Sequence, residues 1–199
     1  MNDKTQRGLF NLEKASVLIA DGDPMGMGIL SQILSGFGAV HIVRAETVVE
    51  ARRHLSATPF DLVVLDPATM GEEGYALPTW MRRTLPPPAR FTPLVIITGH
   101  TQANRVSAAR DSGAHFVISK PVSPTTVFDR ITWIARDKRP FVSCPAYAGP
   151  DRRWKEDGAP DNVGRRDADQ TLNALLSVPD RELTQMEVNS IMQGGRAAP

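Results

Sequence analysis

The sequence predicts an α/β protein with a doubly wound, five-stranded parallel sheet, followed by a mostly irregular arm and short terminal helices. Five short apolar runs alternate with segments of helical periodicity between residues 16 and 136. Fully apolar strands between amphipathic helices require a parallel sheet that is covered on both faces. With 199 residues, the chain has room for one ordinary domain and a substantial additional segment.

The expected elements follow one another without long gaps. Strands are expected at residues 16–21, 39–43, 61–66, 93–98 and 115–120. The first helix begins after Asp23, a good N-cap residue, and ends at Gly36 and Gly38. Further helices are expected at about 46–56, 74–84, 101–112 and 123–136, and Pro86 and its neighbours stop the third helix.

The composition changes after this domain. Residues 138–166 contain seven Lys or Arg against four Asp or Glu and few large apolar residues. We therefore divide the chain into a lead (1–15), a strand–helix domain (16–136), a basic arm (137–169) and a tail with two short helices (170–199). The last helix is marked by a capping box, Thr184 and Glu187.

Composition also narrows the class of protein. Cys144 is the single cysteine, which excludes an internal disulfide framework and fits a reducing compartment. No apolar run reaches the roughly 20 residues that span a bilayer, and the first residues lack a signal-peptide core. A net charge of +1 means that any anion site is local. The sequence therefore predicts a cytoplasmic protein that neither spans a membrane nor binds DNA.

Four of the strand-like runs end in a polar residue: Asp21, Asp66, Thr98 and Lys120. In an open parallel sheet the carboxyl ends of the strands meet at one crevice, where ligands bind. Phosphoryl transfer to a carboxylate needs a nucleophile, a cation and donors for phosphate oxygens. Asp66 is the natural nucleophile, Asp21 a metal ligand, and Lys120 and Thr98 suit the phosphate.

The motifs around these residues resemble the receiver domain of bacterial two-component response regulators. The matching segments are VLIADGDP, FDLVVLD, VIITG and ISKP, in the family's order and spacing. The resemblance covers residues 16–136 and implies a flavodoxin-like fold. It implies that Asp66 accepts a phosphoryl group from a histidine kinase, that Asp21 and Asp66 hold Mg²⁺, and that Thr98 and Lys120 contact the phosphate.

Two positions depart from the family's pattern. The family has a second acid after the first strand, where this chain has Gly22. Mg²⁺ is therefore expected to bind more weakly, because it prefers near-octahedral oxygen ligation. Three residues before Lys120 the family has an aromatic residue that reports phosphorylation by rotating, whereas this chain has Val117.

The basic arm suits a small anionic guanine nucleotide, because Arg pairs with phosphates and guanine and aromatic rings stack on bases. Trp154 and Tyr147 offer such stacking faces. The arm resembles the arginine-rich extension of chemotaxis-type receiver proteins of alphaproteobacteria, which bind cyclic di-GMP and engage the flagellar motor. This resemblance implies that cyclic di-GMP is bound by Asp151, Arg152, Arg153, Trp154, Arg165, Arg166, Asp167 and Asp169.

The leading hypothesis is a non-enzymatic signalling protein that binds cyclic di-GMP through its arm and modulates a protein partner such as a flagellar motor switch protein. The alternative is a conventional phospho-accepting receiver with a partner-binding tail. A hydrolase using Asp66 is less favoured, because no general base for turnover is evident. The helix at 183–195 resembles a motor-switch peptide, and the sequence leaves open whether it docks on its own receiver or on a partner.

Overall fold

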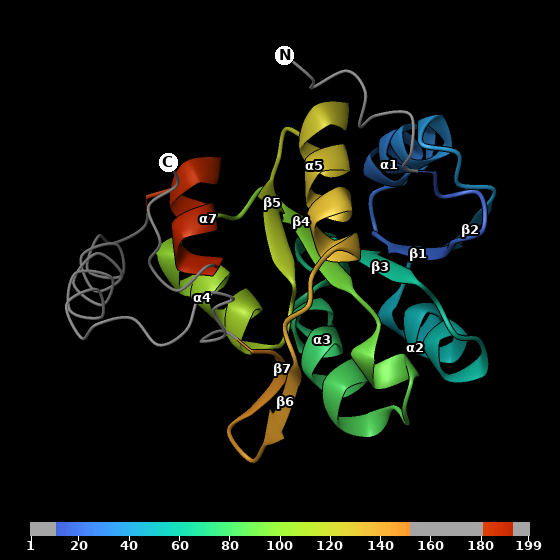
Figure 1. The fold of residues 1–199 in the computed structure, drawn as a ribbon. Coiled ribbons are helices and arrows are strands. Elements are labelled where there is room, and N and C mark those ends of the chain that lie inside the picture. Colours follow the sequence, from blue (N-terminus) through green and yellow to red (C-terminus); the bar gives the residue numbers. More distant parts are fainter. Residues whose placement is uncertain (1–10, 152–180, 193–199) are drawn as a thin grey trace.

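A five-stranded parallel sheet forms the centre of the molecule (Figure 1). The structure, a computed structural model, describes residues 11–151 and 181–192. The strand order is β2-β1-β3-β4-β5, so β2 and β5 are the edges. The strands are β1 (Ser16–Ala20), β2 (His41–Ala45), β3 (Leu62–Leu65), β4 (Leu94–Thr98) and β5 (Phe116–Ser119).

Helices cover both faces of this sheet and complete two separate apolar cores. On one face, α1 and α5 pack against side chains such as Val17 and Ile19. On the other, α2, α3 and α4 pack against the alternate residues, such as Leu18 and Ala20. The helices are α1 (Pro24–Gly36), α2 (Val48–Ala57), α3 (Glu72–Thr84), α4 (Ala103–Asp111), α5 (Pro124–Ala135) and α7 (Gln185–Met192). Short 3-10 turns lie at Ala68–Met70 and Ala89–Phe91.

Local capping signals place the helix starts. The carboxylate of Asp23 accepts hydrogen bonds from the amides of Met25 and Gly26, which makes it the N-cap of α1. Thr47 and Ser123 cap α2 and α5 in the same way. The expected fold class is therefore confirmed, although β2 begins two residues later than the sequence indicates, at His41.

Residues 141–150, which the sequence places in an irregular arm, instead form an antiparallel hairpin of β6 (Phe141–Cys144) and β7 (Tyr147–Pro150). β7 is buried, and Tyr147 donates a hydrogen bond to the carbonyl of Pro150 at 2.8 Å. The hairpin packs against α3 and against the turn between α4 and β5. The proline and glycine content of this segment indicated a linker. Each strand has only four residues, too few to show the alternation of apolar and polar residues that marks a strand. The rest of the arm, residues 152–169, lies outside the described residues.

The last described helix, α7, packs on its own domain beside α4 and β5 (Figure 1). The expected capping box is present, because the Glu187 carboxylate accepts from the Thr184 amide at 2.9 Å. Three apolar side chains of α7, Val188, Ile191 and Met192, are buried in the core on that face of the sheet. The helix candidate around residues 172–176 lies outside the described residues.

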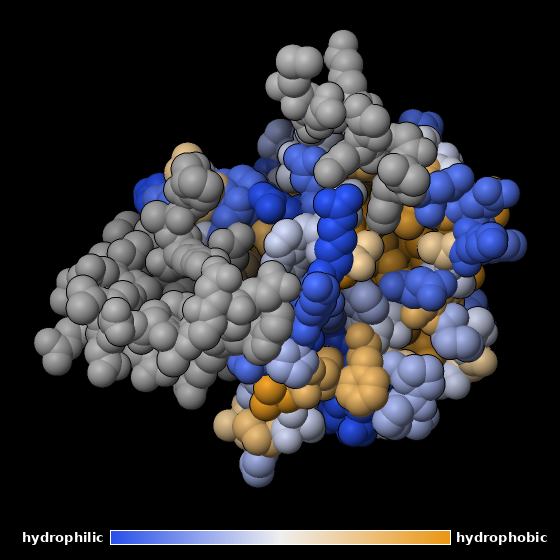
Figure 2. Space-filling model, viewed as in Figure 1, coloured by the Kyte–Doolittle hydropathy of each residue, from blue (hydrophilic) through white to orange (hydrophobic). Residues whose placement is uncertain are grey.

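The surface seen in Figure 2 is largely hydrophilic around α5, with apolar side chains gathered at the hairpin end of the molecule. The exposed ring of Phe91 contacts that of Phe141 edge to face, which ties the 3-10 turn before β4 to the hairpin. Among the residues that the structure describes, no helix combines the length and apolar character that a bilayer crossing needs.

A buried arginine joins α3, the hairpin and the α4–β5 turn. The Arg82 side chain is 1% exposed and donates to the backbone carbonyls of Arg90, Thr92 and Gly113 at 2.7–3.1 Å. Its guanidinium also lies over the ring of Phe141, and burial lowers the pKa of Arg82 to about 10. The guanidinium therefore stays charged at neutral pH and satisfies carbonyls of two different segments, the 3-10 turn before β4 and the α4–β5 turn.

His115 lies beside this arginine, and its burial should make the free energy of unfolding depend on pH. Burial, with the charges of Arg82 and Arg139, holds the pKa of His115 well below 6.5, and its Nδ1 accepts from the Leu94 amide at 3.2 Å. Below pH 6.5 the unfolded chain binds a proton that the folded protein refuses, so stability falls as the pH falls, by at most about 1.4 kcal/mol per unit.

Urea unfolding between pH 7.5 and pH 5 measures this effect. His115→Asn keeps an acceptor for the Leu94 amide and should flatten the pH dependence. The matched variant at the exposed His41, His41→Asn, should retain it. An identical pH profile for wild type and His115→Asn would contradict the assignment.

Candidate functional site

The four polar strand ends meet at one crevice, as the sequence predicts. Asp66 follows β3 and is 2% exposed, and Asp21 follows β1 and is fully buried. The Lys120 Nζ lies 2.6 Å from Asp66 Oδ2 and 3.7 Å from Asp21 Oδ2. Asp66 Oδ1 accepts from the Ala68 amide at 3.0 Å, which fixes the orientation of the carboxylate. One ammonium group therefore bridges two buried carboxylates.

The electrostatics of the crevice favour a charged lysine. Burial alone would lower the pKa of Lys120, but the hydrogen bond and charge of Asp66, with the charges of Asp21 and Asp23, raise it above its usual value. Lys120 is thus protonated over the whole physiological range and can pair with an added phosphate.

Thr98 ends β4 in the same crevice and is 4% exposed. Its Oγ1 accepts a hydrogen bond from the His100 amide at 3.1 Å, so its own proton is available for another acceptor. The next residue, Gly99, has open space where a side chain would begin. The Lys120–Pro121 peptide bond is cis, as the ISKP motif implies.

The missing second acid has a structural cause. A Cβ at Gly22 would lie 2.3 Å from the carbonyl oxygen of Thr69, so no acid fits at this position. The Thr69 hydroxyl accepts from the Gly22 amide at 2.8 Å and lies 2.8 Å from Asp21 Oδ1, to which it can donate. Sequence reasoning missed Thr69, whose only signal is its place three residues after Asp66.

Gly26, in the first turns of α1, is a second residue that sequence reasoning missed. A Cβ there would lie 2.7 Å from Asp21 Oδ2 and 3.3 Å from Lys120 Nζ, so the glycine keeps the crevice open. A glycine inside a helix is unfavourable unless close packing requires it, and this was the available signal. Gly28, two residues further along α1, has nothing within 4 Å of an added Cβ.

The donor set fits a weakly held Mg²⁺ ion. Asp21 Oδ2 is buried without a hydrogen-bond partner. It lies near the Asp66 carboxylate, because the same Lys120 ammonium group is within 3.7 Å of both. Mg²⁺ is commonly held by one or two carboxylates together with waters and substrate phosphate. In the described part of the chain, no cluster of three or more His, Cys, Asp or Glu side chains could hold a metal. Asp23 does not add a ligand, because its carboxylate caps α1.

Of the residues expected to bind nucleotide, only Asp151 lies among the described residues. Its amide donates to the Pro140 carbonyl at 2.8 Å, at the open end of the hairpin. The expectation that Tyr147 offers a stacking face is wrong, because this side chain is buried and its hydroxyl is bonded within the hairpin. The other expected residues, Arg152, Arg153, Trp154, Arg165, Arg166, Asp167 and Asp169, lie outside the described residues.

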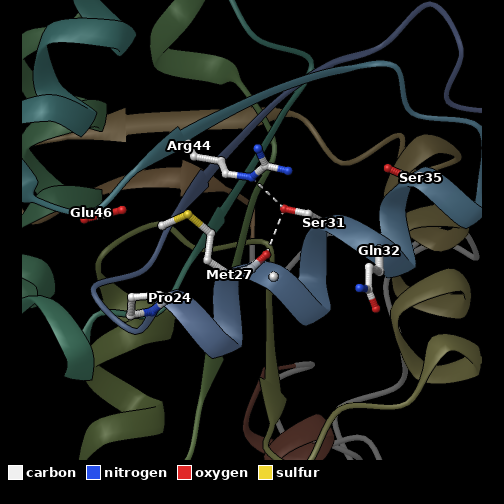
Figure 3. Close-up of a pocket in the computed structure, with 8 residues that line it drawn as sticks. Pro24, Met27, Ser31, Gln32, Ser35, Arg44 and Glu46 are labelled. Carbon is white, nitrogen blue, oxygen red and sulfur yellow. Dashed lines mark hydrogen bonds between the residues drawn. The ribbon is translucent and has the colours of Figure 1, made fainter.

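A separate hollow of about 570 Å³ lies along α1, beside the end of β2 (Figure 3). Arg44 reaches into this region, and its Nε donates to Ser31 Oγ at 3.0 Å. The hollow is lined by Pro24, Met27, Gly28, Ser31, Gln32, Ser35, Arg44 and Glu46. None of the four crevice residues lines it, so it is not the phosphate site.

The sequence of this domain matches the model of one protein family. The family model described as "response regulator receiver domain" matches residues 17–132, more than half of the chain. The chain belongs to the response regulator receiver family. The four strand-end residues all lie within the matched span.

Two curated proteins are similar to part of this chain. Protein PetR of Rhodobacter capsulatus is 29% identical over 120 residues, which make up 60% of this chain and 48% of PetR. A probable cyclic di-GMP phosphodiesterase of Vibrio cholerae is 25% identical over 139 residues, 70% of this chain and 31% of that protein. The chain thus spans about half or less of the length of these relatives.

Solved receiver structures show the same fold. The CheY-like receiver domain protein of Methanospirillum hungatei matches with a TM-score of 0.55 and 23% identity, over 61% of this chain and 94% of the other. The chemotaxis response regulator CheY4 of Vibrio cholerae matches with a TM-score of 0.55 and 22% identity, over 60% and 98%. The uncovered share of this chain is comparable in size to its extension beyond the receiver.

Proposed function

We propose that this receiver accepts a phosphoryl group on Asp66 and uses it as a signal to a protein partner. The observation that supports this proposal best is the bridge from Lys120 to Asp66 and Asp21, at 2.6 and 3.7 Å. A buried carboxylate with a charged lysine and a free hydroxyl donor is suited to attack phosphorus and to stabilise the product.

The chain's own residues account for the transfer. An oxygen of Asp66 attacks the phosphorus of an acyl phosphate or phosphohistidine donor, the new P–O bond forms, and the bond to the donor breaks. Lys120 moves from its ion pair with Asp66 to a phosphoryl oxygen, and the Thr98 hydroxyl donates to another. Mg²⁺, held by Asp21 and Asp66, would offset the charge of the phosphoryl oxygens.

Intact-protein mass spectrometry with acetyl phosphate and Mg²⁺ tests this proposal. Wild type should gain one phosphoryl group, and Asp66→Asn should gain none. Asp61→Asn is the matched control, because Asp61 lies at the opposite end of β3 and accepts from the Ser16 amide. Phosphorylation of Asp66→Asn, or none in wild type at high Mg²⁺, would overturn the proposal. A histidine kinase is the physiological donor that this chemistry fits.

A second function, nucleotide binding, is favoured by the position of the first Arg pair of the basic arm, directly after the hairpin. The Asp151 amide is bonded to the Pro140 carbonyl at the end of the hairpin, and the run Arg152, Arg153 and Trp154 follows Asp151 directly in the sequence. We infer that the arm binds cyclic di-GMP through its Arg and Asp residues, with Trp154 stacking on a base. The bound nucleotide would then modulate a partner, for which a flagellar motor switch protein is our candidate.

Titration calorimetry with cyclic di-GMP on the full chain measures this binding directly. Wild type should release heat, and Arg153→Ala should lose at least about 1.4 kcal/mol, or tenfold in affinity. Lys155→Ala, a nearby change of the same charge, should have a smaller effect. No heat from wild type at modest salt would exclude the nucleotide function and leave phosphoryl acceptance untouched.

A further inference from the structure

Helix α7 and the residues before it are held by two of the four chain segments that form the phosphate crevice. On one side, Thr101 follows Thr98 by three residues and binds the segment before α7. Its amide and hydroxyl donate to the Glu182 carboxylate at 2.5 and 2.8 Å, and its carbonyl accepts from the Leu183 amide at 3.1 Å. A short antiparallel bridge between Gln102 and Glu182 extends this contact.

On the other side, Gln185 binds the free edge of β5 next to Lys120. Its Oε1 accepts from the Ser119 amide at 2.7 Å and from the Ser119 hydroxyl at 2.9 Å. Its Nε2 donates to the Val117 carbonyl at 3.0 Å. One side-chain amide therefore occupies backbone groups that an edge strand otherwise offers to a partner.

Apolar burial holds the rest of the helix. Leu183, Val188, Ile191 and Met192 are at most 5% exposed, and they share a core with Ala103, Val106 and Val117. The small Val117, in place of an aromatic residue, packs in this same cluster. An isolated helix of eight residues does not form in water. The helicity of α7 therefore depends on this docking.

Because of these contacts, a phosphoryl group on Asp66 would disturb the docking of α7. If the Thr98 side chain turns toward the phosphoryl group in order to donate to it, the His100 amide must follow or lose its bond to Thr98 Oγ1. Any movement of residues 99–101 strains the bonds that Thr101 makes to Glu182 and Leu183. A shift of Lys120 toward the phosphate acts in the same way on Ser119 and Gln185.

We propose that α7 is a displaceable lock on the α4–β5 face, an inference that rests on the proposed phosphoryl acceptance. In the unmodified protein α7 covers this face, and a phosphoryl group on Asp66 weakens it through Thr101 and Ser119. The freed face takes an amphipathic helix of α7's own pattern from a partner, with a glutamine followed by apolar residues three, six and seven positions later. Because α7 belongs to the same chain, its high effective concentration keeps such a partner out until the lock weakens.

Hydrogen exchange on the full chain, with beryllofluoride and Mg²⁺ as the phosphoryl mimic, tests the coupling. The amides of residues 185–192 should exchange about tenfold faster, or more, when the mimic is bound. Asp66→Asn should show no such change. Unchanged exchange in α7 while the amides around Asp66 report bound mimic would overturn the proposal.

A fluorescent peptide with the sequence of residues 181–192 tests the face itself. It should bind wild type about tenfold more tightly with the mimic than without it. Ile191→Asp, which breaks the buried contact, should bind the peptide without the mimic. Met186→Asp changes a side chain that is 73% exposed, and it should bind the peptide as weakly as wild type when the mimic is absent. No gain for Ile191→Asp would overturn the docking face. If the mimic does not bind at all, the proposed phosphoryl acceptance and the coupling both fail, and the Ile191→Asp result alone decides whether α7 covers a docking face.

Discussion

Replacing Gly26 by alanine should slow phosphoryl transfer to Asp66 by about 100-fold, because Mg²⁺ neutralisation contributes several kcal/mol to such transfers. The new Cβ would lie 2.7 Å from Asp21 Oδ2, the buried oxygen that has no hydrogen-bond partner. The Asp21 carboxylate must turn away, and the space that a metal ion needs is filled. The initial rate of acetyl phosphate labelling at several Mg²⁺ concentrations measures the effect.

Gly28→Ala is the matched control, because it makes the same change in the same helix where an added Cβ meets nothing. It should label at the wild-type rate and gain roughly 0.5–1 kcal/mol of stability from better helix propensity. Equal labelling rates for the two variants would show that the crevice does not need the space at Gly26.

Arg82→Met should destabilise the fold by about 3–5 kcal/mol, because each backbone carbonyl that loses its buried donor costs about 1–3 kcal/mol. The carbonyls of Arg90, Thr92 and Gly113 would lose their shared donor while remaining buried from water. The hairpin would also lose the cation that lies over the ring of Phe141. Urea unfolding followed by circular dichroism gives the free energy.

The adjacent Arg83 provides the control for this change. It donates to the carbonyls of Cys144 and Pro145 at an exposed part of the hairpin, where water can replace it. Arg83→Met should therefore cost less than about 1 kcal/mol. If the two variants lose the same stability, the burial of Arg82 does not have the role assigned to it.

The fold and the crevice could be predicted because both depend on local patterns. A polar residue directly after an apolar run marks the carboxyl end of a strand, and parallel strands bring such ends together. Asp21, Asp66, Thr98 and Lys120 were found in this way. Asp23 was predicted as a helix cap for an equally local reason, and the structure confirms it.

The features that could not be predicted depend on contacts between distant segments. Gly22 is explained only by the carbonyl of Thr69, which a loop 47 residues later brings against it. Arg82 has the charge of a solvent-facing helix residue, and its burial follows from carbonyls on two other segments. The docking of α7 on its own receiver was left open, because its apolar stripe fits a groove in the same chain or in another equally well.

The central claim, that Asp66 carries the phosphoryl group, has a direct chemical test. Borohydride reduces an acyl phosphate to the alcohol, so a phosphorylated aspartate becomes homoserine, which peptide mass mapping locates. After acetyl phosphate and Mg²⁺ treatment, homoserine should be found at position 66 and not at Asp21, Asp23 or Asp61. Homoserine at another position, or none in a sample that carries bound phosphate, would contradict the account.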